Sequence, residues 1–262
     1  MDKPILNIVS LSGGKDSTAM LLRMLEEGMP VDIILFCDTG MEFPGLYNHI
    51  DKLEKSIGRP ITRLKSPYTF DYYFFEYTPK RKNPALEGQI GLSWAGPRNR
   101  WCTAWLKTRI IDKYLRELEK DYTVVQYIGI AADEPKRVHD LKYPLVDWGM
   151  TEADCLAYCK ERGFDWDGLY DIFHRVSCWC CPLQSYDELR KLRKHFPELW
   201  ERMRYMDKNT WRKITKYYSV EEFETRFAFE DECLEKGLPI KGKAFFDALR
   251  DRLEATERIT PP

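Results

Sequence analysis

The stretch that decides the fold is Ser12–Ser17, which reads SGGKDS. It follows a short apolar run at 5–10 and leads into 17–27, where apolar residues recur at helical spacing. A strand, a glycine turn and a helix in this order gather backbone N–H groups and a helix N-terminus around one point. We therefore predict a phosphate-binding loop, and it is not a Walker A motif, whose first glycine lies farther from the Gly-Lys pair. The residues expected to bind are Ser12, Gly13, Gly14, Lys15, Asp16 and Ser17.

The alternation of strand and helix continues beyond this loop. A continuous aliphatic and β-branched run at 31–36 predicts a strand buried on both faces of a sheet. Further strands are expected at 61–64 and 122–131, and further helices at 46–57, 103–118 and 151–162. This order predicts an α/β fold, a Rossmann-like parallel sheet flanked by helices. The pattern is helical from 186 onward, so we expect an α/β domain over 1–182 and a helical C-terminal extension over 183–262.

The overall composition selects no class of macromolecular partner. The 41 basic and 42 acidic residues leave a net charge of −1, so no global field attracts nucleic acid or membrane. No apolar run approaches the roughly 20 residues of a membrane span, and the N-terminus has no leader pattern. We therefore expect a cytoplasmic protein with no membrane partner. A long aromatic segment at 68–96, broken by prolines and glycines, is expected to form a loop over a site.

The cysteines are unevenly spaced. Of the 8 cysteines, Cys178, Cys180 and Cys181 crowd into one turn, which indicates metal or redox chemistry rather than a disulfide framework. Cys178 and Cys181 have the spacing that lets one loop offer two thiolates to one metal, whereas Cys180 should point away from its neighbour. Cys102 is the best candidate for a third ligand, because basic residues surround it. The others are expected to be small buried hydrophobes: Cys37, Cys155, Cys159 and Cys233.

Several stretches resemble one family. The SGGKDS loop resembles the pyrophosphate loop (PP-loop) of the adenine nucleotide alpha-hydrolase superfamily, which contains the N-type ATP pyrophosphatases and the phosphoadenosine phosphosulfate (PAPS) reductases. CDTGMEFP at 37–44, GIAADEPKR at 129–137 and YPLVDW at 143–148 are similar to segments of the PAPS reductase family. The resemblance spans roughly 8–182, and it implies an enzyme of sulfur metabolism that binds ATP or PAPS.

The resemblance also implies roles for single residues. Asp38 ends the second strand, where α/β sheets bind ligands, and it is expected to hold a magnesium ion or a nucleotide hydroxyl. Asp133 and Glu134 are candidates for the same role from a neighbouring strand end, next to Gly129; helix capping or a solvated turn is the alternative. The expected catalytic residues are Lys15, Asp38 and Cys102.

Basic residues near Cys102 suit an anion. Arg98, Arg100 and Lys107 can donate charge-assisted hydrogen bonds to a sulfate or phosphate, and Arg137 adds a cation from the 129–137 segment. Solvated surface charge is the alternative. Iron–sulfur adenylylsulfate reductases resemble this chain in having cysteines in both segments, which leaves three alternatives for Cys102, Cys178 and Cys181: a [4Fe-4S] cluster, a structural zinc, or a redox dithiol without metal.

Three functions follow from these observations. The first is a PAPS reductase-like oxidoreductase, yet the chain ends ERITPP and lacks the Glu-Cys-Gly-Leu-His motif of thioredoxin-dependent PAPS reductases. The second is an ATP pyrophosphatase-type sulfurtransferase that adenylates a nucleic-acid acceptor, as in phosphorothioation systems and tRNA thiolases. The third is a non-catalytic nucleotide-sensing or nucleic-acid-binding module. The enzymes would need a reductant protein or a sulfur donor.

The segment at 190–216 bears on the nucleic-acid alternative. It carries ten basic residues interleaved with Phe196, Trp200, Tyr205 and Trp211. This composition is compatible with a polynucleotide-binding face, and equally with amphipathic helices that bury their aromatic residues.

Overall fold

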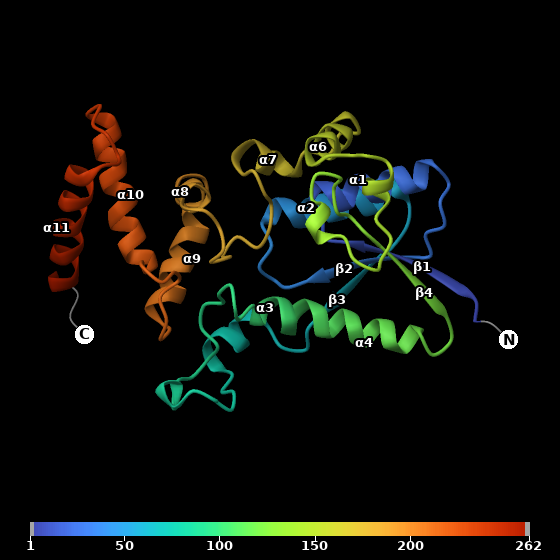
Figure 1. The fold of residues 1–262 in the computed structure, drawn as a ribbon, viewed down its shortest axis with the longest axis horizontal. Helices are drawn as coiled ribbons and strands as arrows, with labels where there is room; N and C mark the ends of the chain where they lie inside the picture. Colours follow the sequence, from blue (N-terminus) through green and yellow to red (C-terminus); the bar gives the residue numbers. More distant parts are fainter. Residues whose placement is uncertain (1–2, 260–262) are drawn as a thin grey trace. The chain divides into compact units, whose positions relative to one another are not determined.

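The computed structural model describes residues 3–259, which form two compact units (Figure 1). The first unit contains the described residues up to Phe70 together with Arg100–Cys181. The second contains Asp71–Asn99 together with the described residues from Pro182 onward. The expected α/β domain over 1–182 and helical extension over 183–262 stay predictions.

The first unit is built on a parallel sheet in the strand order β3-β2-β1-β4. Register is fixed by pairs such as Ile8 with Ile33 and Ser10 with Ile128. This arrangement confirms the predicted α/β fold. The strands are β1 (Ile5–Leu11), β2 (Ile33–Asp38), β3 (Ile61–Lys65) and β4 (Thr123–Ile128).

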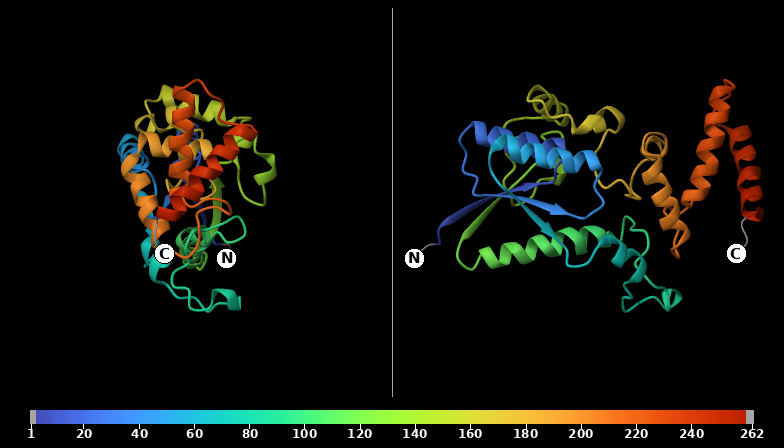
Figure 2. Two further views of the ribbon diagram at one scale, coloured as in Figure 1. Left: turned by 90° about the vertical axis from the view of Figure 1, so that its left-hand side faces the viewer. Right: turned by 180° about the vertical axis from the view of Figure 1, so that it is seen from behind.

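Helices cover both faces of this sheet. Figures 1 and 2 show α1 and α2 over one face and α4 over the other. On the α4 side, Ile8 and Leu35 from the sheet pack with Leu115, so the buried strands predicted from their apolar runs form one core. The helices of this unit are α1 (Lys15–Glu26), α2 (Pro44–Ile57), α3 (Trp101–Thr103), the π-helical turn η3 (Ala104–Thr108), α4 (Arg109–Leu118), η4 (Pro135–Arg137), α5 (Pro144–Asp147), α6 (Glu152–Glu161), η5 (Trp166–Gly168) and α7 (Leu169–Ile172).

Local sequence signals set where these helices begin. Pro44 occupies the first turn of α2, where its missing N–H costs nothing. Thr151 caps α6 by accepting a hydrogen bond from Asp154 N, and the Asp154 side chain accepts one from Thr151 N. This capping box places Glu152 at the first position of α6.

The second unit is helical, as predicted for the C-terminal region. Its elements are η1 (Tyr72–Glu76), η2 (Pro84–Leu86), α8 (Tyr186–His195), α9 (Pro197–Lys208), α10 (Val220–Glu235) and α11 (Lys243–Ile259). The segment 68–96, expected to be a loop over a site, instead contributes Phe74 and Trp94 to the interior of this unit. The Trp94 indole donates to Asp207 on α9 at 2.6 Å, a long-range contact that local sequence does not reveal. Within residues 3–259, no helix is long and apolar enough to cross a membrane.

Candidate functional site

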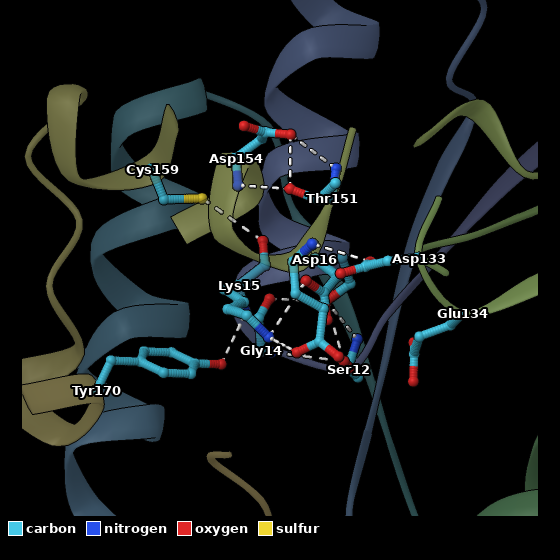
Figure 3. Close-up of polar contacts among 12 residues, drawn as sticks. Ser12, Gly14, Lys15, Asp16, Asp133, Glu134, Thr151, Asp154, Cys159 and Tyr170 are labelled. Carbon is cyan, nitrogen blue, oxygen red and sulfur yellow. Dashed lines mark hydrogen bonds and ion pairs between the residues drawn. The ribbon is translucent and has the colours of Figure 1, made fainter. Parts of the chain in front are cut away.

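The SGGKDS loop joins β1 to α1 in a conformation that depends on its glycines. Gly13 has a φ of +82°, which favours glycine, and Gly14 caps α1. Two aromatic side chains from the segment after α6 hold the loop backbone: the Trp166 indole donates to Gly13 O at 2.7 Å, and Lys15 N donates to the Tyr170 hydroxyl at 2.9 Å. These two side chains anchor the loop backbone, and Figure 3 shows the Tyr170 hydroxyl beside Lys15.

The serines close the loop on itself. The hydroxyls of Ser12 and Ser17 lie 3.0 Å apart, and Ser17 Oγ also accepts a hydrogen bond from Ser12 N and donates to Gly14 O. Gly129, just after β4, packs directly on this turn: a Cβ there would lie 2.6 Å from Ser17 Cα. Gly129, predicted to bind the nucleotide, thus lies against the loop because it has no side chain.

Lys15 is the buried cation of the loop. Its side chain forms ion pairs with Glu152 and with Asp16, the latter at 3.4 Å, and the residue is only 7% exposed. Burial works to lower the pKa of Lys15, but the hydrogen bond to Glu152 and the charges of Asp16 and Glu152 outweigh it and raise that pKa. The ammonium therefore stays charged, and two carboxylates already neutralise it.

Further carboxylates gather around this cation. Burial, reinforced by the charges of Glu152 and Glu134, raises the pKa of Asp16 despite the attraction of Lys15. Asp16 Oδ1 is buried and accepts no hydrogen bond from the described residues, although the Lys15 ammonium lies 3.4 Å from it. Asp133 accepts a hydrogen bond from Glu152 N at 3.1 Å, which ties the segment after β4 to the start of α6.

Two of the predicted residues pair with each other beside the loop. The Arg137 guanidinium lies 2.5 Å from the Glu134 carboxylate, which raises the pKa of Arg137. Arg137 also interacts electrostatically with Asp16 and Glu152. The loop thus faces more carboxylates than cations. The structure also brings the predicted carboxylates Asp133 and Glu134 close to the predicted loop residues (Figure 3).

Asp38 ends β2 and is fully engaged within the protein. Its carboxylate accepts hydrogen bonds from Gly40 N at 2.8 Å and the Tyr47 hydroxyl at 2.7 Å, and it forms an ion pair with Lys65 at 2.8 Å. Burial works to raise the pKa of Asp38, but these donors outweigh it and lower that pKa. Asp38 is therefore ionised and organises the chain after β2; its expected contact with magnesium or nucleotide stays a prediction.

The cysteine turn is bonded to the same chain segment. Trp179 N donates to Met41 O at 3.1 Å, and Glu42 and Cys178 form a β-bridge. The Cys178 thiol donates to Glu42 Oε1 at 3.8 Å, and Cys181 N donates to Cys178 O at 3.2 Å, which closes the turn. We call Thr39, Glu42, Lys107 and Cys178 the thiol corner.

Glu42 is the centre of the thiol corner. It is 5% exposed, and its carboxylate accepts hydrogen bonds from Thr39 N, the Thr39 hydroxyl, Met41 N and the Tyr47 hydroxyl. Lys107 extends from the π-helical turn η3, with its ammonium 3.2 Å from Glu42 Oε1. This carboxylate is saturated with donors.

The predicted ligands Cys102, Cys178 and Cys181 lie near enough for their charges to interact. Burial, followed by repulsion from Cys181, raises the pKa of Cys102. Burial raises the pKa of Cys178 to about 12, although Lys107 opposes it. Burial also raises the pKa of Cys180 strongly, and this residue packs in the interior.

Thiols of this kind suit zinc or an iron–sulfur cluster. However, over 3–259 no three or more His, Cys, Asp or Glu side chains are arranged to hold a metal ion. The Cys178 thiol is instead directed to Glu42 and Thr39. The three thiols are thus not arranged as one metal site within the described residues, and the expected [4Fe-4S] cluster or zinc ion stays a prediction.

The predicted anion-binding residues are not gathered into one group. Lys107 pairs with Glu42 and Arg137 with Glu134, each beside a different strand. Arg100 is exposed at the start of α3, and its charge works to lower the pKa of Cys102. Arg98 belongs to the second unit.

Sequence reasoning missed five residues that build these two sites: Glu42, Lys65, Glu152, Trp166 and Tyr170. Glu42 lies inside the 37–44 motif, and Glu152 follows the capping residue of α6. Both residues therefore lie within or next to a sequence pattern that could have indicated them. Trp166 and Tyr170 reach the loop from about 150 residues away, as the Trp166 to Gly13 hydrogen bond with its separation of 153 residues shows. No local sequence pattern predicts such a contact.

A sequence model of the family described as "Phosphoadenosine phosphosulfate reductase domain" matches residues 7–184. The chain belongs to this family. The resemblance seen in the loop and the 37–44 and 129–137 segments is thereby confirmed, and membership is consistent with nucleotide-binding sulfur chemistry.

Three proteins illustrate what this chain is similar to. An uncharacterised protein of Methanocaldococcus jannaschii is 28% identical over 216 residues, covering 76% of this chain and 40% of that protein. The chain thus spans less than half the length of that relative. Among solved structures, PAPS reductase from Candida auris in a phosphate complex is similar with a TM-score of 0.47 and 16% identity, covering 66% of this chain and 81% of that one. U34-tRNA thiolase NcsA from Methanococcus maripaludis with its [4Fe-4S] cluster is similar with a TM-score of 0.39 and 17% identity, covering 87% of this chain and 74% of that one.

Proposed function

We propose that this chain is an enzyme that uses magnesium and ATP to activate an acceptor oxygen for sulfur transfer. Membership of the PAPS reductase family supports a nucleotide and sulfur chemistry. The choice of ATP rests on one observation: Lys15, the buried cation of the phosphate loop, is already neutralised by Asp16 and Glu152.

Charge balance at the loop favours a nucleotide that brings a cation with it. Asp16, Asp133, Glu134 and Glu152 outnumber the two nearby cations, so bare phosphates would be repelled. A sulfonucleotide such as PAPS would need basic side chains to balance its charge. In the magnesium complex of ATP the ion lowers the net negative charge and can itself bind the carboxylates.

The donor set near the loop fits magnesium. Mg²⁺ takes oxygen ligands and is commonly held by one or two carboxylates plus substrate phosphates. Asp16 Oδ1, buried and without a hydrogen-bond donor among the described residues, is the carboxylate oxygen we assign to it, with Glu134 or Asp133 as the second. When bound, the ion neutralises the phosphate charge and favours departure of pyrophosphate.

The residues of the chain then have distinct tasks. The acceptor oxygen attacks the α-phosphorus of ATP, the bond from that phosphorus to the bridging oxygen breaks, and pyrophosphate leaves. Lys15 and the loop N–H groups stabilise the negative charge on the departing group. Sulfide then attacks the activated carbon, and AMP leaves. If the persulfide of a donor protein attacks instead, its outer sulfur bonds to that carbon, AMP leaves, and a second thiol must then attack the inner sulfur to release the product and form a disulfide. Cys102, Cys178 and Cys181 are the candidates to carry that sulfur.

Sulfonucleotide reduction is the second candidate, and the thiols support it. In that reaction a thiolate attacks the sulfur of an adenylyl sulfate, the adenosine phosphate leaves, and a reductant protein then releases sulfite. The raised pKa of Cys178 means that its thiol is protonated at neutral pH, so attack first requires transfer of the thiol proton. Glu42 accepts a hydrogen bond from this thiol and is the group placed to take the proton.

A product assay separates these functions. Pure protein is incubated anaerobically with Mg–ATP and with PAPS plus dithiol, and pyrophosphate and sulfite are measured. Pyrophosphate from ATP supports the proposal, and sulfite without pyrophosphate supports the reductase. Neither product with any acceptor tested favours the non-catalytic nucleotide-sensing alternative. Iron, zinc and sulfide analysis of the same sample tests the expected [4Fe-4S] cluster or zinc, which stays a proposal.

A further inference from the structure

The second unit carries exposed cations that the proposed function does not use. Many basic residues of 190–216 form ion pairs with carboxylates. Most of α8 and α9 therefore does not offer a polyanion-binding face. Arg190 pairs with the buried Glu230, Arg193 with Glu224, and Arg204 with Glu221. Lys191, Arg202 and Lys213 are also in ion pairs.

Two segments of this unit are rich in cations without an ion pair. Lys80, Arg81, Lys82 and Arg98 belong to 78–98, and Lys208, Arg212 and Lys216 belong to 208–217; none forms an ion pair within the described residues. Glu87 is the sole acidic residue of the two segments. We call 78–98 and 208–217 together the basic surface.

Direct contacts make these two segments one surface. The Arg81 guanidinium lies 5.2 Å from the Trp211 ring centroid, and both side chains donate to Gly91 O, at 2.6 Å and 3.2 Å. Arg212 donates to Trp94 O at 3.4 Å. The Trp94 indole in turn donates to Asp207, whose carboxylate also accepts a hydrogen bond from Ile214 N within the second segment. The cations are therefore displayed on an anchored frame.

Exposed aromatic rings and a hollow accompany the cations of the basic surface. Tyr217 is 67% exposed beside Lys216, whose ammonium lies 5.3 Å from its ring centroid, and Tyr205 at the end of α9 is 54% exposed. The loop 78–89 encloses a hollow of about 360 Å³ lined by Lys80, Arg81 and Lys82. Figure 1 shows this loop extending away from the helices of its own unit.

We propose that the basic surface binds single-stranded nucleic acid, which would be the acceptor in the proposed sulfur transfer; the acceptor role rests on that function, but the binding does not. Unpaired Lys and Arg side chains track a phosphodiester backbone, and exposed aromatic rings stack on unpaired bases. An acidic protein partner would pair with the cations, but it would not account for the exposed aromatic rings beside them. Both RNA and DNA present this chemistry.

The test measures binding by the full chain without ATP. Fluorescein-labelled 20-nucleotide single-stranded RNA, single-stranded DNA and duplex DNA are titrated at 50 and 200 mM salt, and anisotropy is recorded. The variant is Lys80→Gln/Lys82→Gln/Lys216→Gln. The matched control is Lys236→Gln/Lys241→Gln/Lys243→Gln, which removes the same charge from exposed positions of the same unit.

We expect a single strand of at least one type to bind with strong salt dependence and duplex to bind more weakly. The basic-surface variant should lose about tenfold in affinity at low salt and reduce the salt slope by about 2, since each single-strand phosphate contact contributes roughly 0.7. The control should stay within about twofold of the original chain. Tyr217→Ala should weaken single-strand binding about fivefold or more with no change in duplex binding.

Three results would overturn the proposal: no binding of either single strand at 50 mM salt, equal losses in the variant and the control, or an unchanged affinity in Tyr217→Ala together with equal binding of duplex. Binding of Mg–ATP to the same variants is measured in parallel. If nucleic acid binds and ATP does not, the proposed function fails while this surface stands; the reverse result leaves the ATP site and removes the surface.

Discussion

The phosphate loop and the thiol corner both hold a buried lysine against carboxylates, but they differ in what remains open. At the loop, Lys15 meets Asp16 and Glu152, and one oxygen of Asp16 still accepts no hydrogen bond among the described residues. At the thiol corner, Glu42 accepts bonds from Thr39, Met41 and Tyr47 and pairs with Lys107. The loop has more carboxylates than cations, whereas the carboxylate of the thiol corner is fully engaged. This difference supports the proposal that a cation and its nucleotide bind at the loop, while burial keeps the Cys178 thiol protonated.

The largest expected effect comes from removing the open carboxylate. Asp16→Asn should lower pyrophosphate release from Mg–ATP by about 100-fold, because the assigned magnesium ligand is lost. The free energy of unfolding should not fall at neutral pH, since burial raises the pKa of Asp16 and its ionisation is unfavourable in the folded state.

The pH dependence of the stability of Asp16→Asn tests whether the ionised Asp16 carboxylate destabilises the fold. A carboxyl group whose folded pKa is raised costs stability as pH rises through its titration range, and an asparagine does not titrate. The stability of Asp16→Asn relative to the original chain should therefore increase from pH 3 to pH 7 in urea unfolding. A decrease over this range would show that the charge of Asp16 stabilises the fold.

The next effect concerns the frame of the loop. Gly129→Ala places a Cβ 2.6 Å from the backbone of Ser17, which cannot move without distorting the turn. We expect a loss of about 1–3 kcal/mol in the free energy of unfolding, measured by denaturation, together with weaker nucleotide binding. Gly96→Ala is the control, because its Cβ would meet only the mobile end of Arg212. Equal losses in the two variants would argue against tight packing at Gly129.

A smaller effect tests the charge balance directly. Glu152→Gln removes one carboxylate from Lys15 and keeps its shape. Affinity for ATP in the absence of magnesium should rise about fivefold, since one repulsive charge disappears and the ammonium is released toward phosphate. Calorimetric titration with and without magnesium measures this change. A fall in metal-free affinity would instead assign Glu152 to nucleotide binding.

The smallest expected effect lies in the thiol corner. Glu42 raises the pKa of Cys178 and Lys107 lowers it, so Glu42→Gln should speed alkylation of Cys178 at pH 8 and Lys107→Met should slow it. Peptide-resolved mass spectrometry after iodoacetamide separates Cys178 from Cys180 and Cys181. Changes of about two- to fivefold in opposite directions are expected. Equal rates in the two variants would mean that the charges of this corner do not control the thiol.

The parts of this molecule that sequence predicted are those that local patterns determine. The parallel sheet followed from apolar runs such as the one at 31–36, and the phosphate loop from glycines between a strand and a helix. The carboxylates after β4 were located because strand ends in parallel sheets gather at one edge. These signals act over a few residues and need no knowledge of tertiary contacts.

The parts that sequence could not supply depend on distant packing. Trp166 supports Gly13, and Trp94 bonds to Asp207 across more than a hundred residues. The partners of Lys107 were equally hidden: its basic neighbours suggested an anion site, but Glu42 neutralises it from another strand end. Charge counted along the chain therefore overestimated the free positive charge near Cys102.

The most direct test of the central claim is a comparison of nucleotides by isothermal titration calorimetry. ATP with magnesium, ATP with EDTA and PAPS with EDTA are each titrated into the full chain. The carboxylate-rich loop predicts tight binding of ATP only with magnesium and weak binding of metal-free PAPS. Metal-free PAPS binding more tightly than Mg–ATP would contradict the account and return the phosphate loop to sulfonucleotide reduction.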